Sequence, residues 1–271
     1  MNSNSEQLTV ISYQLFEKHN EIAHFCTSRE GGVSVGNYAS FNLSPFSGDN
    51  PIHFEINLQL LADKLGIIPD KIIIPFQTHE TEIRHIDRKF LNLPAAEKKE
   101  HLSGIDALIT NCPNVCIGIT TADCVPLLFF DPVQKVIAAA HAGWRGTCGR
   151  IAEKTVLAMI SLYNCLPENI LVTIGPSISA QVYNVGKELI ENFKSARFEA
   201  SEIFETRNEV IFLDLWKANR SSLLSAGIQP HHIETSGICT FTEHEKFFSA
   251  RRLGIKSGRM LSGIMLKKTN I

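Results

Sequence analysis

The sequence predicts a mixed α+β fold, in which helices pack outside a large mixed β-sheet or sandwich. Three observations favour it. Short segments rich in Ile and Val, bounded by Gly, Pro, Asn or Asp, outnumber the segments with helical periodicity. The two kinds of segment do not alternate as they would in a doubly wound parallel sheet. Neighbouring strand-like segments also follow one another without a helix between them, which favours antiparallel pairing.

The strand candidates share a short apolar pattern that ends at turn-forming residues. In chain order they are 8–16, 22–28, 71–78, 83–86, 106–110, 115–121, 125–130, 136–140, 170–174, 210–213 and 261–266. The helix candidates share apolar residues at three- and four-residue spacing and a stop signal. They are 54–65, ended by Gly66; 147–162, stopped before Pro167; 187–194; and 213–226, ended by Gly227.

The whole chain, residues 1–271, is predicted to form a single domain. A chain near this length hides about three quarters of its unfolded surface when it folds, so it can bury a large core without disulfides or metals. Its 44% hydrophobic and 20% charged residues are typical of globular proteins. No internal repeat, low-complexity tract or clear linker divides it.

Charge and cysteine usage restrict the possible partners and compartment. The chain has 26 Lys and Arg against 28 Asp and Glu, without the basic excess typical of a nucleic-acid binder. It has no apolar run near the roughly 18 residues that a membrane helix needs, and no signal peptide at its start. We therefore expect no nucleic acid and no membrane as partners. The seven cysteines are then expected to be reduced thiols of a cytoplasmic protein.

The most informative stretch is 120–147, which reads TTADCVPLLFFDPVQKVIAAAHAGWRGT. It predicts a hairpin whose turn is 131–134, with Pro at the second position, as type I turns prefer. In that register Cys124 lies directly opposite His141. Opposed residues of an antiparallel pair have Cβ atoms about 4.5–5.5 Å apart, so these two side chains could share a metal or a proton.

Two chemistries fit this pair. Imidazole could activate the Cys124 thiolate as a nucleophile, or both side chains could bind a metal with a third ligand. His79 is the best third ligand because it ends an apolar strand, and His24 is its nearest competitor. Two His and one Cys with an open fourth position are typical of catalytic zinc. Copper also binds Cys and His, but the ten histidines include no H-x-H pair, which argues against a multicopper oxidase centre.

Three further segments are candidates for binding substrate or an anion. Gly143 and Arg145 follow His141 at the predicted start of a helix, where accessible N–H groups and a guanidinium suit phosphate, and Thr147 could cap that helix. Arg29 lies beside paired glycines and could bind phosphate or a carboxylate. Asn42 is a loop amide that could bind substrate.

Several motifs together resemble one known family. They are SREGGVS at 28–34, QTH at 77–79, TTADCVPLL at 120–128, HAGWRGT at 141–147, IGPSI at 174–178 and FFSARR at 247–252. On these motifs, the chain resembles the YfiH-type purine nucleoside phosphorylase family, also called the laccase-domain or polyphenol oxidase family. The resemblance spans about residues 22–266. One departure is Gln181-Val182-Tyr183, where the family often has Cys before Tyr.

The resemblance implies a function, a metal and a fold. It implies a zinc ion held by His79, Cys124 and His141 and a mixed α/β sandwich. It also implies phosphorolysis of adenosine, inosine and methylthioadenosine to free base and ribose-1-phosphate, together with adenosine deamination. Purine nucleosides and phosphate would then be the substrates, and Asp123 could carry a proton or support a ligand. The sequence leaves open whether the chain is a monomer or a homodimer.

Two alternatives remain at this stage. The chain could be a cysteine-type hydrolase or peptidoglycan-precursor editing factor, with Cys124 as the nucleophile. It could also be a copper-dependent polyphenol oxidase, since the family carries that label.

Overall fold

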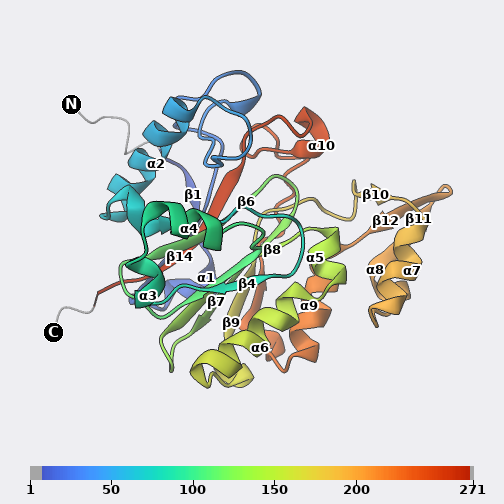
Figure 1. Ribbon diagram of the computed structural model, residues 1–271. Coiled ribbons are helices and arrows are strands. Elements are labelled where there is room, and N and C mark those ends of the chain that lie inside the picture. Colours follow the sequence, from blue (N-terminus) through green and yellow to red (C-terminus); the bar gives the residue numbers. More distant parts are fainter. Residues whose placement is uncertain (1–7, 269–271) are drawn as a thin grey trace.

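Two β-sheets lie face to face at the centre of the molecule, and helices cover the outer face of each (Figure 1). The structure is a computed structural model, and it describes residues 8–268. One apolar core fills the space between the two sheets. A second core lies between one sheet and the helices that cover it, and a third lies between the other sheet and its covering helix. The predicted α+β sandwich with helices outside is therefore confirmed.

The first sheet is mixed and has five strands. Its order is β1 (Val10–Ile11), β2 (Ile22–Thr27), β14 (Met260–Leu266), β6 (Cys116–Thr121) and β3 (Ile72–Ile73). Neighbouring strands are antiparallel except β3 and β6, which run parallel. The last strand of the chain, β14, thus lies in the middle of this sheet.

The second sheet is mixed and has six strands. Its order is β13 (Ile233–Thr235), β9 (Leu171–Ile174), β7 (Val125–Asp131), β8 (Val136–Ala142), β5 (Ala107–Thr110) and β4 (Ile83–His85). Every residue of β7 and β8 is buried, because both faces of this sheet are covered. Leu127 and Phe129 of β7 face the helices, whereas Leu128 and Phe130 face the other sheet.

Helices close both outer faces. The second sheet is covered by α6 (Ile151–Tyr163) and α9 (Leu215–Ser225), and the first by α2 (Pro51–Leu65). The boundaries of α2 follow from its sequence: Asn50 caps the start, Pro51 occupies the first turn, and Gly66 ends it with φ of 68°. The longest helix, α2, has 15 residues, and none within residues 8–268 is long and apolar enough to cross a membrane.

The remaining elements are short. Three strands form a small separate sheet, in the order β10 (Asn184–Val185), β12 (Val210–Leu213) and β11 (Phe204–Arg207). With α7 (Glu188–Ser195) and α8 (Ala200–Ile203), this sheet lies at one end of the molecule, at the right of Figure 1. The other short helices are α1 (Gln14–Glu17), α3 (Arg88–Leu91), α4 (Ala95–His101), α5 (Trp144–Cys148) and α10 (Ala250–Leu253), with 3₁₀ turns at Gly36–Tyr38, Pro69–Lys71, Pro167–Asn169 and Pro230–His232.

Three predicted elements are wrong in extent. The strand at 8–16 is only β1, and the chain then turns into α1. The strand at 71–78 stops after two residues as β3, and Pro75 just beyond it has no N–H for a ladder. The helix at 147–162 is two helices, α5 and α6, because Arg150 adopts φ of 60° between them.

The β7–β8 hairpin is confirmed, but its predicted register is wrong by two residues. Asp131 pairs with Val136, so the loop has four residues instead of two. The Asp131 carboxylate accepts the N–H groups of Val133 and Gln134, and Lys135 adopts φ of 53° to complete the loop. His141 consequently pairs with Pro126. A shift of two residues keeps each side chain on its predicted face, so Cys124 and His141 still lie on the same face of the sheet.

Candidate metal centre

Three side chains that the sequence singled out meet at one end of the sandwich. The ligand atoms of His79, Cys124 and His141 all lie within 4.8 Å of one another. His79 comes from the loop between β3 and β4, Cys124 directly precedes β7, and His141 lies in β8. No other group of three or more His, Cys, Asp or Glu with this spacing occurs in residues 8–268. The competitor His24 is elsewhere, in β2, against the rings of two core aromatics.

Gly143 allows the cysteine to reach the histidines. Continuing the observed register, Cys124 lies opposite Gly143. A Cβ atom on Gly143 would lie 2.9 Å from the Cys124 sulfur and 3.3 Å from Cδ2 of His79. The glycine therefore leaves the space that two of the three candidate ligands occupy. It is also the N-cap of α5, so Thr147 does not cap this helix as predicted; its hydroxyl lies 3.3 Å from the Ala142 carbonyl.

A carboxylate that the sequence analysis missed supports the histidines. His141 Nδ1 lies 2.7 Å from Oδ1 of the fully buried Asp106, which leaves Nε2 as the ring nitrogen available for a metal. The same carboxylate accepts backbone N–H groups of Thr78, His79 and Glu80 at 2.9–3.2 Å. In the sequence, Asp106 is marked only by its place at the start of a buried strand, where turn residues are also common.

The electrostatics favour a thiolate at Cys124. Burial opposes ionisation, but the charge of His141 and hydrogen bonds from His141 and His79 outweigh it and lower the pKa of Cys124 to about 6. Burial likewise disfavours the charged form of His141, yet Cys124 and Asp106 raise the pKa of His141 above its ordinary value. A thiolate and two imidazoles, one of them oriented by a carboxylate, are a donor set that fits a zinc ion with one open position.

Asp123, which was predicted to carry a proton or support a ligand, is held by three hydrogen bonds within the protein. Its carboxylate accepts hydrogen bonds from the hydroxyls of Thr240 and Ser249 at 2.8 and 3.0 Å and from the N–H of Arg251 at 2.7 Å. The residue has φ of 85°, a strained conformation for an aspartate. Asp123 therefore anchors the turn that presents Cys124.

A small cavity of about 60 Å³ adjoins two of the three candidate ligands, His79 and Cys124, together with Asp123. Trp144 and Arg145 of α5 and Tyr183 line it, together with Ile178 and Leu215. Arg145 is exposed, and its guanidinium lies 4.3 Å from the Trp144 ring centroid. Burial raises the pKa of Tyr183 to about 12, so its phenol stays protonated and can donate a hydrogen bond. Sequence reasoning missed Tyr183, Ile178 and Leu215, because each is distant in the chain from the hairpin.

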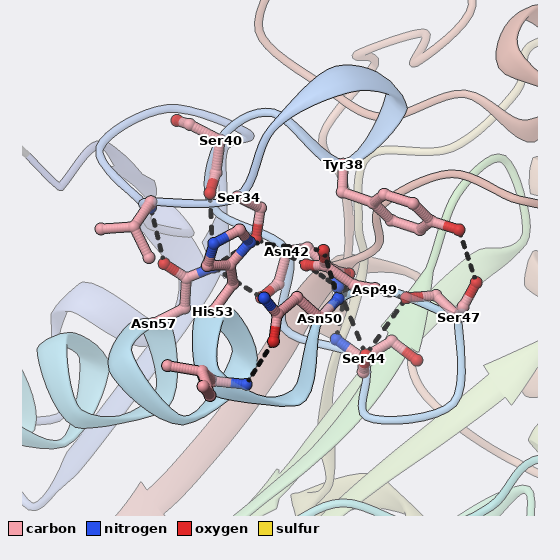
Figure 2. A network of polar contacts seen from close by, with 12 residues as sticks. Ser34, Tyr38, Ser40, Asn42, Ser44, Ser47, Asp49, Asn50, His53 and Asn57 are labelled. Atoms are coloured by element: carbon pink, nitrogen blue, oxygen red, sulfur yellow. Dashed lines mark hydrogen bonds and ion pairs between the residues drawn. The ribbon is translucent and has the colours of Figure 1, made fainter.

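Two other predicted binding residues form hydrogen bonds within the protein, away from this cavity. Arg29 donates to the carbonyls of Ala39 and His244 at 2.8 and 2.9 Å. Asn42 is fully buried, and its amide joins a network that includes Asp49, as Figure 2 shows. Its Oδ1 also accepts the N–H of Arg259 at 2.9 Å. Both residues therefore stabilise the loop between β2 and α2, and neither lines the cavity.

Known proteins share this fold and length. A purine nucleoside phosphorylase of Bacteroides thetaiotaomicron is 44% identical over 261 residues, covering 96% of this chain and 97% of that protein. A protein named adenosine deaminase RL5, from an unknown prokaryotic organism, is 40% identical over 90% of this chain and 93% of its own. The crystal structure of Bacillus licheniformis hypothetical protein YfiH superposes with a TM-score of 0.87 at 33% identity, covering 93% of this chain and 95% of that one.

The motif-based resemblance is confirmed by these comparisons. The family model described as multi-copper polyphenol oxidoreductase laccase matches residues 23–267. That match includes all three candidate ligands and both central sheets almost completely. The chain therefore belongs to the multi-copper polyphenol oxidoreductase laccase family, among relatives named purine nucleoside phosphorylase.

Proposed function

We propose that this chain is a zinc-dependent purine nucleoside phosphorylase that also deaminates adenosine, and that it works in the cytoplasm. Its substrates would be adenosine, inosine and methylthioadenosine, cleaved by phosphate to free base and ribose-1-phosphate. The observation that carries the proposal is the His79–Cys124–His141 group beside a cavity that the guanidinium of Arg145 and the phenol of Tyr183 also line. Relatives named purine nucleoside phosphorylase and adenosine deaminase support the substrate class.

Zinc is the metal that this donor set favours. A thiolate with two imidazoles and an open fourth position is typical of catalytic zinc sites. When bound, zinc supplies Lewis-acid polarisation of an oxygen atom placed at that position. A multicopper centre needs several metal sites, and in residues 8–268 only one group has suitable spacing. The polyphenol oxidase alternative is therefore not favoured, although the family description carries copper in its name.

Arg145 is the residue that we assign to phosphate. Its side chain is exposed beside the cavity, and it has no carboxylate partner among the described residues. A guanidinium can bind two phosphate oxygens at once, which fixes the orientation of the nucleophile. Helix α5 has only five residues, so the side chain, more than the helix dipole, would supply the positive charge.

In phosphorolysis, a phosphate oxygen forms a bond to the anomeric carbon of the ribose while the bond to the purine nitrogen breaks. The purine leaves with the bonding electrons and takes up a proton from solvent. The protonated phenol of Tyr183 would donate a hydrogen bond to a substrate atom in the cavity. A cavity of about 60 Å³ is smaller than the roughly 300 Å³ or more of ligand pockets, so Tyr183 or Trp144 must move aside when substrate binds.

The test combines metal analysis with a nucleoside assay read by mass spectrometry. The purified chain should contain close to one zinc and should release free base from adenosine, inosine or methylthioadenosine only when phosphate is present. Arg145→Ala should keep the zinc and raise the KM for phosphate at least tenfold. Cys124→Ala should lose both zinc and turnover.

Other outcomes would contradict the proposal. A zinc-free Cys124→Ala variant with full turnover would remove the metal from the reaction. Activity that survives in metal-free protein but is lost on thiol alkylation would favour the cysteine hydrolase alternative. Faster phenol oxidation by copper-loaded protein than by free copper would favour the oxidase.

A further inference from the structure

Asp106 contacts two separate parts of the candidate metal centre with one carboxylate. Oδ1 lies 2.7 Å from His141 Nδ1 and accepts the N–H of His79 at 3.1 Å. Oδ2 accepts the N–H groups of Thr78 and Glu80 at 3.2 and 2.9 Å. The Asp106 carbonyl also accepts the N–H of His141 at 2.8 Å. Four N–H groups thus converge on two oxygens in a residue with no exposed surface.

His79 depends on this carboxylate because no strand holds it. Strand β3 ends at Ile73 and β4 begins at Ile83, so His79 lies in an irregular loop. It has φ of 65°, a left-handed conformation that is unfavourable for a residue with a side chain. Three consecutive N–H groups around it point at the same carboxylate, which stabilises that conformation. The exposed His79 ring is thereby held 4.7 Å from the ring of His141.

No Lys or Arg compensates the buried charge of Asp106 within the described chain, where its one ion-pair partner is His141. A buried carboxylate that lacks a cation is costly unless it is fully hydrogen-bonded. A metal ion bound by His141 would place positive charge on the far side of that ring. The charge arrangement therefore suits a site that is occupied by a cation.

We propose that Asp106 is the positioning residue for both histidine ligands, setting His141 through its ring and His79 through its backbone, and that metal affinity and geometry depend on it. This inference rests on the metal centre of the proposed function. It does not depend on the nucleoside chemistry.

The variant Asp106→Asn tests it, because an amide cannot satisfy this arrangement. If the NH₂ group takes the place of Oδ2, it faces the fixed N–H donors of Thr78 and Glu80 and releases the His79 loop. If it takes the place of Oδ1, it faces His141 Nδ1, which can accept only by moving its proton to Nε2, the metal-facing nitrogen. Either placement removes one histidine from the ligand set.

Asp131→Asn is the matched control. Asp131 is also a fully buried aspartate, but it lies at the opposite end of β7 and β8 from Cys124 and His141. Its Oδ1 accepts the N–H groups of Val133 and Gln134, and an amide oxygen can keep both. Its Oδ2 has no hydrogen-bond partner among the described residues, so an amide NH₂ there would face no N–H donor.

The experiment titrates Zn²⁺ and Co²⁺ into metal-free native protein and both variants, with no nucleoside present. Zinc dissociation constants come from chelator competition, and Co²⁺ visible absorption bands report coordination geometry. Asp106→Asn should bind zinc about 10- to 100-fold more weakly and change the Co²⁺ spectrum, whereas Asp131→Asn should stay within about threefold of native. Native affinity and a native Co²⁺ spectrum in Asp106→Asn would overturn the proposal.

A measurement on the native protein covers the case in which Asp106→Asn does not fold. Nitrogen-15 NMR of the zinc-loaded chain should find His141 protonated at Nδ1 and unprotonated at Nε2. Protonation at Nε2, with the metal at Nδ1, would overturn the proposal. A native chain that binds zinc in this way but leaves nucleosides intact would contradict the proposed function alone, and one that binds no zinc would contradict both.

Discussion

At the scale of single residues, the candidate metal centre depends on residues that are not ligands. Gly143 supplies space for a sulfur atom, Asp106 fixes an imidazole and a loop, and Asp123 anchors the turn before Cys124. None of these contributions is a ligand bond, yet each determines where a ligand atom lies. Substitution at such positions should therefore affect the metal more than the fold.

Gly143→Ala tests this separation. Its φ of −67° suits alanine, so the substitution should cost the backbone little. The new methyl group would lie 2.9 Å from the Cys124 sulfur, which must then shift. We expect zinc affinity to fall at least tenfold while the urea midpoint of the metal-free protein changes little.

Gly186→Ala serves as the control for that substitution. Its Cβ would meet only the flexible end of the Glu188 side chain, far along the chain from the ligands. Zinc affinity should then equal that of the native chain. Equal zinc affinities in both alanine variants would show that metal binding does not require the absence of a side chain at Gly143.

Sequence reasoning found the candidate ligands better than it found their surroundings. Residue type and the alternation of the hairpin were enough to bring Cys124 and His141 together, even though the register was wrong by two residues. Asp106 and Tyr183 were missed because their roles depend on loop conformations and long-range packing. Arg29 and Asn42 were chosen for their chemistry, but their polar groups bind the protein itself.

At the scale of elements, a buried polar network joins helix α2 to the loop that precedes it (Figure 2). Asn57 of α2 is fully buried, and its amide donates to the Ser34 hydroxyl and to the carbonyls of Ser40 and Asn42. Its Oδ1 accepts the N–H of Val33 at 2.9 Å. This single side chain therefore satisfies several buried backbone groups of one loop.

Asn57→Ala should destabilise the protein by about 2–4 kcal/mol, because it removes a fully buried side chain that makes four hydrogen bonds and leaves the buried carbonyl of Asn42 without this donor. The urea midpoint measures this loss. Asn50→Ala, at the exposed cap of the same helix, removes one hydrogen bond to the N–H of Ile52 and should cost only about 1 kcal/mol. Equal losses at the two positions would contradict the structural role of the network.

Strand β2 contains a histidine whose burial should make stability depend on pH. Burial lowers the pKa of His24 to about 4, the nearby charge of Lys267 adds to this effect, and Glu17 opposes it. His24 packs against the rings of Tyr13 and Phe16, and its Nδ1 has no partner within the described residues. The folded protein therefore favours neutral His24 at a pH where the unfolded chain binds a proton.

The sign follows from that difference. The unfolded chain takes up the proton below its ordinary pKa of about 6.5, so stability falls as the pH drops from about 6.5 towards 4. Because the side chain is partly exposed, His24→Phe should recover only about 1 kcal/mol at pH 4.5. Urea denaturation of both proteins at pH 4.5 and 7.5 measures this. Parallel pH profiles would show that another group causes the acid sensitivity.

At the scale of the whole molecule, the layered sandwich was predictable but the order of its strands was not. Short apolar segments that do not alternate with helices predicted a mixed sheet or sandwich with helices outside, and the two central sheets confirm it. The central place of β14 follows from contacts between the two ends of the described chain, which local pattern does not encode. Several short helices and β10, β11 and β13 were missed because two to four residues carry too little periodicity.

The three candidate ligands come from separate parts of this sandwich, so a bound metal would link them. Cys124 and His141 lie at the ends of the buried strands β7 and β8, whereas His79 belongs to the irregular loop between Ile73 and Ile83. A metal that binds only the folded state stabilises it by RT ln(1 + [L]/Kd), about 4 kcal/mol at a thousandfold excess over Kd. This stabilisation should be greatest in the segment that otherwise opens most easily, which is the loop that contains His79.

Removal of the metal with a chelator should therefore act locally. We expect faster amide hydrogen exchange at residues 78–80, whose N–H groups donate to the Asp106 carboxylate, and little change in β7 and β8, whose ladder is complete without a metal. The melting temperature should fall and return when zinc is added back. Uniformly faster exchange across both sheets would mean that the metal supports the whole fold, and unchanged exchange at residues 78–80 would mean that His79 does not hold it.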